Sequence, residues 1–449
     1  MTEWKKVKIG EIFKIEKGSL QSSKCIPGKY DFITAATDWK THESYSHDFE
    51  AIVYAVAASG SLGRTHYVKG KFIASDLCFI LTEKNKEKYP INFLFYQLVF
   101  EVLRDEIVSK TKTGTSKESI NQKNFSNYEI PYIPYDYQMN NYKKLVDAKK
   151  TVIKILKEIE SQKAYAKQLR QNILQEAIEG KLTEEWRKEN PVVKGNPDFD
   201  AEALFEKIQV EKCHTDSELP LETSLRIRNS KKKVFEPIAE NEQPFEIPKG
   251  WKWVRLGEII KDSPRNGYSP KAVDFETPIK TLKLGAVTYG IFDASEFKYI
   301  NEEIPKDAHC WLKNGDILIE RSNSIEYVGI CAIYTGKDDE FMYPDLLMRF
   351  RTSDSLSKEY IHKVLVSPFN RQYFMNNAKG SQKTMPKINQ ETVSNTLIPL
   401  PPLAEQKEIV SCVEKLLTNV AELEKQITER EEMTKQLMQS IMKDAFREV

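Results

Sequence analysis

Two long stretches of the chain carry apolar residues three and four positions apart, with charged and polar residues between them. This spacing predicts amphipathic helices. The first runs from Tyr142 to Gly180, a glycine typical of a helix C-terminus, and the second follows Pro402. Their apolar positions are Leu145, Ala148, Val152, Ile155, Ile159, Ala166, Leu169 and Ile173, and Val413, Leu416, Val420, Leu423, Ile427, Leu437 and Ile441.

Each of these helices alone would expose its apolar stripe, so each needs a partner. The two stripes match position by position, and the polar interruptions at Gln162 and Arg430 fall at equivalent places. We therefore predict two long antiparallel helices that form a coiled coil, seam to seam. Two alternatives stay open from the pattern itself. Each helix could pack on its own domain, or the last helix could join two copies of the chain.

The segments outside these helices alternate β-branched runs with turns and shorter helical patterns, as mixed α/β domains do. Strands are predicted at 51–56, 72–73, 315–319 and 328–334, and a helix over 90–108. The predicted fold class is therefore α+β. The predicted boundaries are 1–137 for the first α/β domain, 138–180 for the first long helix, 181–250 for a surface linker with a helical pattern around 203–212, 251–403 for the second α/β domain and 404–449 for the last helix.

An internal repeat relates the two halves of the chain. Residues 4–12 return 247 positions later as 251–259. Residues 121–138 return 268 positions later as 389–406, and the match continues without a gap into both long helices. This period is too long for a solenoid. It indicates a duplicated module with a pseudo-two-fold axis, which presents two similar but unequal surfaces.

Composition narrows the class of protein. The chain has 449 residues, of which 40% are hydrophobic and 30% charged, as expected for a globular protein of two or three domains. Its net charge of +1 argues against a purely electrostatic nucleic-acid binder, but it allows local basic loops. Six scattered cysteines without a C-x-x-C motif, no signal peptide and no membrane-length apolar run predict a cytoplasmic location.

The sequence lacks the common catalytic motifs. The sequence has no P-loop, no G-x-G-x-x-G after a strand, and no Asn-Pro-Pro-aromatic or Asp-Pro-Pro-Tyr tetrapeptide of an amino-methyltransferase. The two histidines of His42–His47 are spaced one residue too far apart for a zincin. We therefore predict no cofactor, no metal and a binding role. An enzyme with an unrecognised site, such as a nuclease, is a remaining alternative.

Polar loops with basic residues occur at equivalent places before each long helix, at 109–117 and 371–387. Three turn-like segments, 58–64, 265–268 and 320–324, add arginine, asparagine and serine. Lysine and arginine neutralise phosphates, and arginine and asparagine pair with guanine and adenine. Solvated loops and ordinary hairpin turns are the alternative reading. The candidate DNA-binding residues are Ser59, Ser61, Arg64, Lys110, Lys112, Thr113, Thr115, Ser116, Lys117, Arg265, Asn266, Tyr268, Arg321, Ser322, Asn323, Lys379, Ser381, Gln382, Lys383 and Lys387.

The chain resembles the specificity (S) subunits of type I restriction–modification systems over essentially its whole length. The resemblance rests on the motif that opens each half, on 315–322, on the Ile-Pro-Leu-Pro-Pro-Leu-Ala-Glu-Gln run of 398–406, and on 174–191, which looks like the family's first conserved region. The first half departs from the pattern, because 132–138 reads Tyr-Ile-Pro-Tyr-Asp-Tyr-Gln.

This resemblance implies two target-recognition domains, 1–137 and 251–403, that each read one half of a split double-stranded DNA sequence. It also implies helices that separate these domains and dock two modification (methyltransferase) subunits, and two restriction subunits that join to make the motor nuclease. Catalysis would lie in those other subunits. The runner-up is a protein–protein scaffold whose two α/β domains bind peptides.

Overall fold

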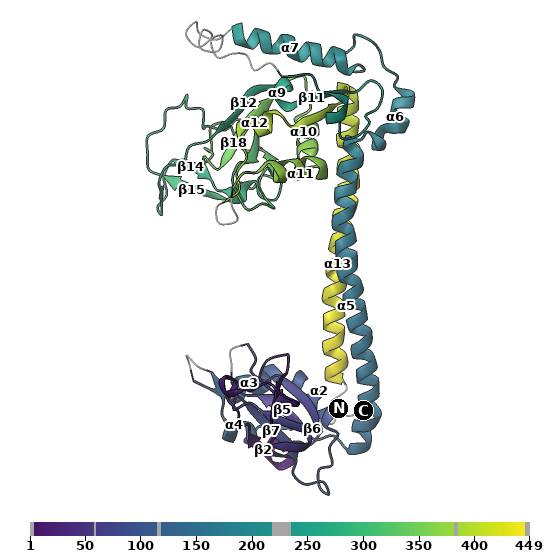
Figure 1. The fold of residues 1–449 in the computed structure, drawn as a ribbon, viewed down its shortest axis with the longest axis vertical. Coiled ribbons are helices and arrows are strands. Elements are labelled where there is room, and N and C mark those ends of the chain that lie inside the picture. The colour runs from purple at the N-terminus through teal and green to yellow at the C-terminus, as the bar shows by residue number, and fades with distance from the viewer. Residues whose placement is uncertain (1–3, 58–59, 115–117, 218–234, 381–384, 445–449) are drawn as a thin grey trace. The chain divides into compact units, whose positions relative to one another are not determined.

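The computed structural model describes residues 4–57, 60–114, 118–217, 235–380 and 385–444 (Figure 1). The chain divides into two compact units. Unit 1 comprises residues 1–162 and 426–449, and unit 2 comprises residues 163–425. Each long helix contributes residues to both units.

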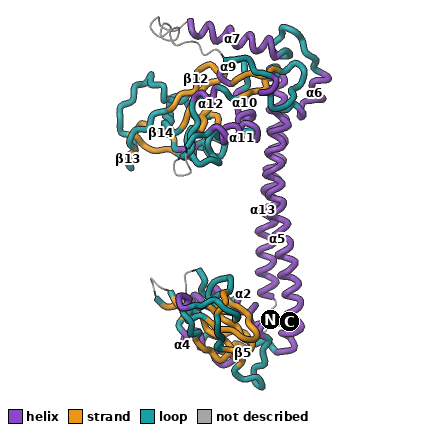
Figure 2. The backbone as a smooth tube through the Cα atoms, in the orientation of Figure 1, coloured by secondary structure: helices purple, strands orange, loops and turns teal. Residues whose placement is uncertain are grey.

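Unit 1 is a curved sheet covered by helices (Figure 2). Before the first long helix its elements are β1 (Lys6–Lys8), α1 (Ile9–Ile12), β2 (Phe13–Lys17), β3 (Tyr30–Ile33), β4 (Lys40–His42), β5 (His47–Ala55), β6 (Thr65–Ala74), β7 (Cys78–Glu83), α2 (Phe93–Val102), α3 (Arg104–Thr111), β8 (Lys112–Thr113), β9 (Ser119–Ile120), α4 (Gln122–Asn127) and β10 (Glu129–Pro131). The main sheet has the order β2-β7-β5-β6-β3-β4. Its neighbours are antiparallel except β3 and β6.

The strands predicted at 51–56 and 72–73 are confirmed in β5 and β6. The helix predicted over 90–108 is two helices, α2 and α3, which break at Leu103. The aromatic core beneath α2 includes Tyr54, whose ring lies 5.5 Å from that of Phe100 and 4.6 Å from that of Phe125.

Unit 2 contains two sheets of three or more strands and one two-stranded pair. Its elements between the long helices are α6 (Glu184–Glu189), α7 (Ala201–Ser217), β11 (Lys252–Arg255), α9 (Leu256–Ile259), β12 (Ile260–Asn266), β13 (Ala272–Val273), β14 (Ile279–Leu282), β15 (Phe297–Ile300), β16 (Ile317–Glu320), β17 (Cys331–Ile333), β18 (Leu347–Thr352), α10 (Lys358–Leu365), α11 (Pro368–Asn377), α12 (Gln390–Ser394) and β19 (Leu397–Leu400). An antiparallel four-stranded sheet has the order β12-β18-β16-β17, and a smaller one has the order β13-β15-β14.

The strands predicted at 315–319 and 328–334 are confirmed as β16 and β17. The helical pattern predicted around 203–212 is α7, which is longer than expected. This helix packs on unit 2 through side chains that donate to the backbone of α9: Gln209 Nε2 lies 3.0 Å from the Glu258 carbonyl oxygen, and Lys212 Nζ lies 2.9 Å from that of Gly257.

The sequence repeat corresponds to a repeated local structure inside each unit. In unit 1, β1 pairs with β10 so that Val7 faces Ile130, and in unit 2, β11 pairs with β19 so that Val254 faces Ile398. Val7 and Val254 are 247 positions apart, and Ile130 and Ile398 are 268 positions apart, which are the two offsets of the sequence match. The duplication therefore preserves strand register as well as residue type.

A buried glutamine ties each long helix to its α/β domain in the same way. The side-chain oxygen of Gln138 accepts a hydrogen bond of 2.7 Å from the backbone N–H of Asn92, the N-cap of α2. The oxygen of Gln406 accepts one of 3.0 Å from the N–H of Ser357, the N-cap of α10. The departure of residues 132–138 from the family pattern therefore leaves this junction unchanged.

The long helices are α5 (Tyr135–Ile178) and α13 (Leu403–Asp444). The first begins at Tyr135 rather than at 138 and is followed by Gly180, which adopts the left-handed conformation (φ 72°) expected of a helix-ending glycine.

Among the described residues, no helix is long and apolar enough to cross a membrane.

The stripe of buried side chains along these helices is narrower than the predicted apolar stripe. Leu169, Leu423 and Leu437 were predicted to be buried, but they are 42%, 47% and 53% exposed. Fully buried positions instead recur about once every two turns, so a leucine three or four residues away lies on the flank of the stripe. Buried side chains with this spacing are Leu145, Val152, Ile159, Ala166 and Ile173 in α5, and Val413, Val420 and Thr434 in α13; Ala177, Ile178 and Ile409 are buried as well.

Contacts between the two helices are found within each unit. In unit 2, Arg170 pairs with Glu424 at 2.9 Å, while Thr183, just after α5, bonds to Glu405 near the start of α13. Residue numbers thus rise along one helix as they fall along the other, so the two helical segments of unit 2 run antiparallel. In unit 1, Ile441 of α13 packs against the buried cluster that contains Leu145.

Candidate nucleic-acid interface

The candidate segments of unit 2 gather at one end of its four-stranded sheet. Strand β12 ends at Asn266, which pairs with Met348, and β16 ends at Glu320, which pairs with Leu347 at the start of β18. Because β12 and β16 both pair antiparallel with β18, both end beside its first residues, and the segments 265–268 and 320–324 leave the sheet at the same edge.

A short ladder joins the third candidate segment of unit 2 to this edge. Lys379 and Lys387 exchange both backbone hydrogen bonds, at 2.9 and 3.0 Å, and we call this pair ladder 2. The backbone N–H of Ile388 donates to the carbonyl oxygen of Arg321 at 3.0 Å. Ser322 and Lys387 form an isolated antiparallel β-bridge. Both ladder lysines are exposed. Ser381, Gln382 and Lys383 lie outside the described residues.

The same arrangement occurs in unit 1. Strand β8 pairs with β9, and we call this pair ladder 1. The N–H of Ile120 donates to the carbonyl oxygen of Val56 at 2.8 Å, just beyond the end of β5. Ile120 and Ile388 are 268 positions apart, so the two ladders attach to equivalent strand ends. Ser59, Thr115, Ser116 and Lys117 lie outside the described residues.

Hydrogen bonds within the protein already engage Arg64, a predicted base reader of unit 1. Its Nη1 donates to the carbonyl oxygen of Ala35 at 2.6 Å and to the hydroxyl of Ser61 at 3.0 Å. Arg104, which the sequence did not single out, donates to the carbonyl oxygens of Leu62 (2.7 Å) and Gly60 (3.3 Å). Both arginines therefore shape the turn after β5. In ladder 1, Lys112 forms an ion pair of 2.7 Å with Glu118, while Lys110 and Thr113 are exposed.

The candidate side chains of unit 2 fall into two groups. Some are held by the protein: Asn323 donates to Glu320 at 2.6 Å, and Tyr268 donates to Glu302 at 3.1 Å. Others are available. Arg265 is exposed, and Arg321 makes one long hydrogen bond of 3.2 Å, to the carbonyl oxygen of Asp345.

Two buried polar atoms at this edge have no hydrogen-bond partner among the described residues. The hydroxyl of Ser322 and the side-chain oxygen of Asn266 are buried and form no hydrogen bond with any described residue. Buried polar atoms are normally satisfied, so an unpaired one indicates a place for a water or a ligand atom. Both atoms belong to residues predicted to bind DNA.

Glu320 organises the loop that carries Arg321 and Asn323. Burial raises the pKa of its carboxyl group, against the opposing effects of the hydrogen bonds from Thr288 and Asn323. The Thr288 hydroxyl lies 2.6 Å from a Glu320 carboxyl oxygen and 2.9 Å from the Leu284 carbonyl oxygen. One hydroxyl proton cannot serve two acceptors, so a protonated Glu320 satisfies this cluster better than an ionised one.

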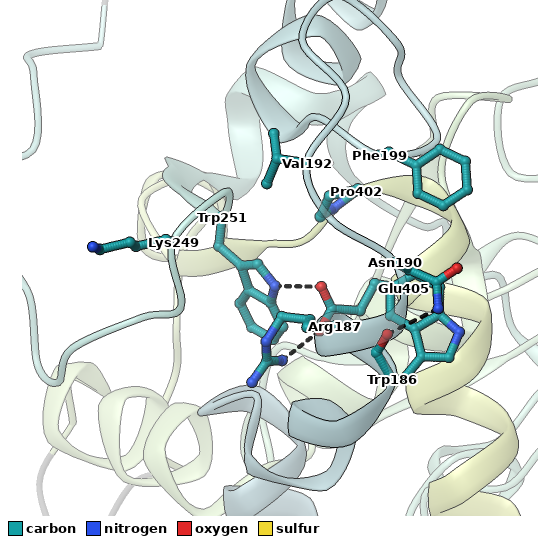
Figure 3. Close-up of a pocket in the computed structure, with 9 residues that line it drawn as sticks. All are labelled: Trp186, Arg187, Asn190, Val192, Phe199, Lys249, Trp251, Pro402 and Glu405. Atoms are coloured by element: carbon teal, nitrogen blue, oxygen red, sulfur yellow. Dashed lines mark hydrogen bonds and ion pairs between the residues drawn. The ribbon is translucent and has the colours of Figure 1, made fainter.

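A pocket of unit 2 gathers several functional groups but serves a structural purpose (Figure 3). Its buried acid is Glu405, which accepts hydrogen bonds from Trp251 Nε1 (2.7 Å), Thr183 Oγ1 (2.7 Å) and Arg187 Nη1 (2.5 Å). Arg187 also donates to the carbonyl oxygen of Gly180 at 2.6 Å. The carboxylate is thus fully engaged in holding the segment after α5 on α13. Among the described residues, no cluster of acids, histidines or cysteines could hold a metal ion.

Comparisons with known proteins agree on one family. The family model for the type I restriction modification DNA specificity domain matches residues 1–164 and 248–432. The chain is 29% identical over 252 residues to the EcoEI specificity subunit of Escherichia coli, a match over 55% of this chain and 39% of that protein. It is 25% identical over 456 residues to the EcoDI specificity subunit of Escherichia coli, covering 99% of this chain and 88% of the relative.

Among solved structures, the HsdS subunit from Thermoanaerobacter tengcongensis shares the fold with a TM-score of 0.54 and 18% identity, over 100% of this chain and 97% of that one. The family model covers well over half of the chain in two separate matches, one in each repeat. The chain therefore belongs to the family defined by the type I restriction modification DNA specificity domain.

Proposed function

We propose that this chain is the DNA-reading specificity subunit of a type I restriction–modification complex, with one half of a split target read by each unit. The observation that carries the proposal is the repeated edge: ladder 1 at Val56 and ladder 2 at Arg321 attach by equivalent backbone hydrogen bonds of 2.8 and 3.0 Å. A duplicated binding protein is expected to keep its contact surface at equivalent places. The candidate residues of both units cluster around these two edges.

The chemistry of the edges suits double-stranded DNA. Lys379 and Lys387 are exposed and are paired with no described acidic residue, so they can neutralise phosphates. The guanidinium groups of Arg265 and Arg321 can donate hydrogen bonds to base edges. Each arginine directly precedes a residue whose polar side-chain atom has no partner among the described residues, Asn266 or Ser322. Lys112 already pairs with Glu118, so unit 1 is expected to rely less on this position.

The two half-sites are expected to differ. Unit 1 carries a single six-stranded main sheet, whereas unit 2 carries a four-stranded sheet and a second sheet of three strands. The ladders and strand ends match between the units, but the loops around them do not. Each unit would therefore place its readers differently on the bases.

We also propose that α5 and α13 form an antiparallel coiled coil that relates the units by a pseudo-two-fold axis and sets the spacer between the half-sites. The support is a buried seam that repeats with the same 268-residue offset in both helices, as at Leu145 and Val413. Two modification subunits, and two restriction subunits in a complete system, would dock on this assembly and supply the catalysis.

The proposal is tested by salt-dependent binding of the complex formed with the modification subunits. The target is first mapped from methylated adenines in the source genome. Lys387→Ala is expected to weaken binding and to reduce the slope of log affinity against log salt by about one, as for one lost phosphate contact. Fluorescence anisotropy with the mapped duplex measures both.

The matched control is Lys207→Ala, which removes an exposed lysine from α7 and is expected to leave the slope unchanged. Lys112→Ala should change it by less than Lys387→Ala, because Glu118 already neutralises that ammonium. If the wild-type complex bound the mapped duplex no better than a scrambled one at any salt concentration, DNA reading would be refuted. A peptide-binding scaffold would then be favoured.

A further inference from the structure

One turn of unit 2 exposes two large apolar side chains next to the proposed interface. Tyr289 is 82% exposed and Ile291 is 77% exposed, the highest values for large apolar side chains among the described residues. Scattered apolar side chains on a surface are ordinary, but two such residues flanking a single glycine form a compact apolar tip.

The turn that carries this tip is well anchored. Gly290 adopts the left-handed conformation (φ 74°), and its N–H donates to the carbonyl oxygen of Val287 at 2.9 Å. The N–H of Asp293 donates to the carbonyl oxygen of Ala286 at 3.0 Å and closes the turn. Both Ala286 and Val287 are fully buried. Because these contacts already fix the backbone of the turn, little further conformational entropy is lost when its two exposed side chains bind a partner.

The tip lies at the same sheet edge as ladder 2. Thr288 bonds to Glu320 at 2.6 Å, and Glu320 directly precedes Arg321. A Cβ on Gly290 would lie 3.8 Å from the carbonyl oxygen of Cys331, the first residue of β17. Cys331 in turn pairs with Ile319 of β16.

Other exposed apolar side chains occur in the candidate segments or directly beside them. Ile325, Tyr268 and Met385 are 45%, 44% and 48% exposed. Apolar side chains are thus interleaved with the basic residues of this edge. On such a surface, lysines and arginines can contact the phosphates of a nucleic acid while the projecting apolar side chains contact bases that have become unstacked.

Building on the proposed function, we propose that Tyr289 and Ile291 form an apolar wedge that inserts at a base step of the half-site read by unit 2. Proteins that insert such side chains unstack the step and kink the duplex, and the cost of unstacking is offset by additional contacts. Continuity with Arg321 and ladder 2 favours DNA over a protein as the occupant. The inserted step is expected to be a flexible pyrimidine–purine step, so the wedge reads deformability.

The test uses the complex with the modification subunits and mapped duplexes that carry 2-aminopurine at successive positions of both half-sites. The fluorescence of this base rises when it is unstacked. We expect a rise at one step of one half-site for the wild-type complex and its loss for the double variant Tyr289→Ser, Ile291→Ser. Affinity for the mapped duplex should fall about tenfold, which corresponds to about 1.4 kcal/mol. Both residues are exposed, so folding should be unaffected, as thermal unfolding would verify.

The matched control is Val210→Ser, which removes a 55% exposed apolar side chain from α7 and should leave fluorescence and affinity at wild-type values. Unchanged fluorescence and affinity in the double variant would overturn the wedge, while a wild-type preference for the mapped duplex would still uphold DNA reading. Loss of co-purification with the modification subunits, with DNA binding by the chain retained, would also overturn it and assign the tip to a protein contact. A wild-type complex without preference for the mapped duplex would instead refute the proposed function.

Discussion

A seven-residue insertion after Gln162, matched by one after Arg430, is expected to abolish methylation at the native targets and to create targets with a longer spacer. Seven residues lengthen an α-helix by about 10.5 Å. This corresponds to about three base pairs at 3.4 Å each. Seven residues are also two turns to within about 20°, so the buried seam stays in register. Both half-sites should keep their bases, which genome-wide mapping of methylated adenine would show.

Three base pairs also rotate the duplex by about 100°, because a turn of DNA takes about 10.5 base pairs. The lengthened target should therefore be bound more weakly than the native one is by the wild-type protein. An equal insertion after Gly195, where a Cβ would meet nothing within 4 Å, is the control and should leave the spacer unchanged. Methylation by the helix variant at targets with the original spacing would show that the helices do not set it.

The substitution Glu405→Ala is expected to destabilise unit 2 by about 3–5 kcal/mol, the usual cost of removing one partner of a buried ion pair. The side chain of Glu405 is 2% exposed and that of Arg187 is 19% exposed. Alanine would leave the Arg187 guanidinium without its counter-charge and the Trp251 N–H without its acceptor (Figure 3). Equilibrium unfolding in urea, monitored by tryptophan fluorescence, measures the change.

A double-mutant cycle separates the ion pair from the rest of the network. Glu405→Gln keeps an acceptor for Trp251 but loses the charge, so it should cost less than Glu405→Ala. In the background of Arg187→Ala, the cost of Glu405→Ala should shrink, because the buried charge is already gone. Equal costs in the two backgrounds would mean that the two side chains do not stabilise each other.

Much of the fold could be predicted because the sequence repeats. The apolar periodicity located both long helices, and the shared offset matched Gln138 with Gln406, whose side chains make equivalent hydrogen bonds to the N-cap residues of α2 and α10. Periodicity was less reliable for burial. It placed Leu169 and Leu437 in the seam, but both are exposed, since spacing alone does not determine how wide a stripe the partner covers.

The candidate site was predictable in place but not in detail. The sequence located loops at equivalent positions, and the structure brings segments 265–268, 320–324 and ladder 2 to one edge. It could not show that Arg64 is engaged by Ala35, because that contact joins segments 29 residues apart. Nor could the sequence show that Tyr289 is 82% exposed, since exposure follows from tertiary packing.

The repeat also hides a local asymmetry that only the contacts reveal. Tyr137 stands at the position equivalent to Glu405, and its ring packs edge-on against Trp4, with 5.1 Å between the ring centroids. The Trp4 indole N–H is buried and has no partner among the described residues, whereas its equivalent in Trp251 donates to Glu405. Matching residue types therefore did not guarantee matching interactions.

The central claim is that each unit independently reads one half of a split target. Its most direct test replaces residues 251–403 with the equivalent segment of a family member that has a different target, followed by mapping of methylated adenines in cells that express the chimaera and its modification subunits. We expect a new sequence in one half-site, with the other half-site and the spacer unchanged. A change in both half-sites, or in neither, would contradict it.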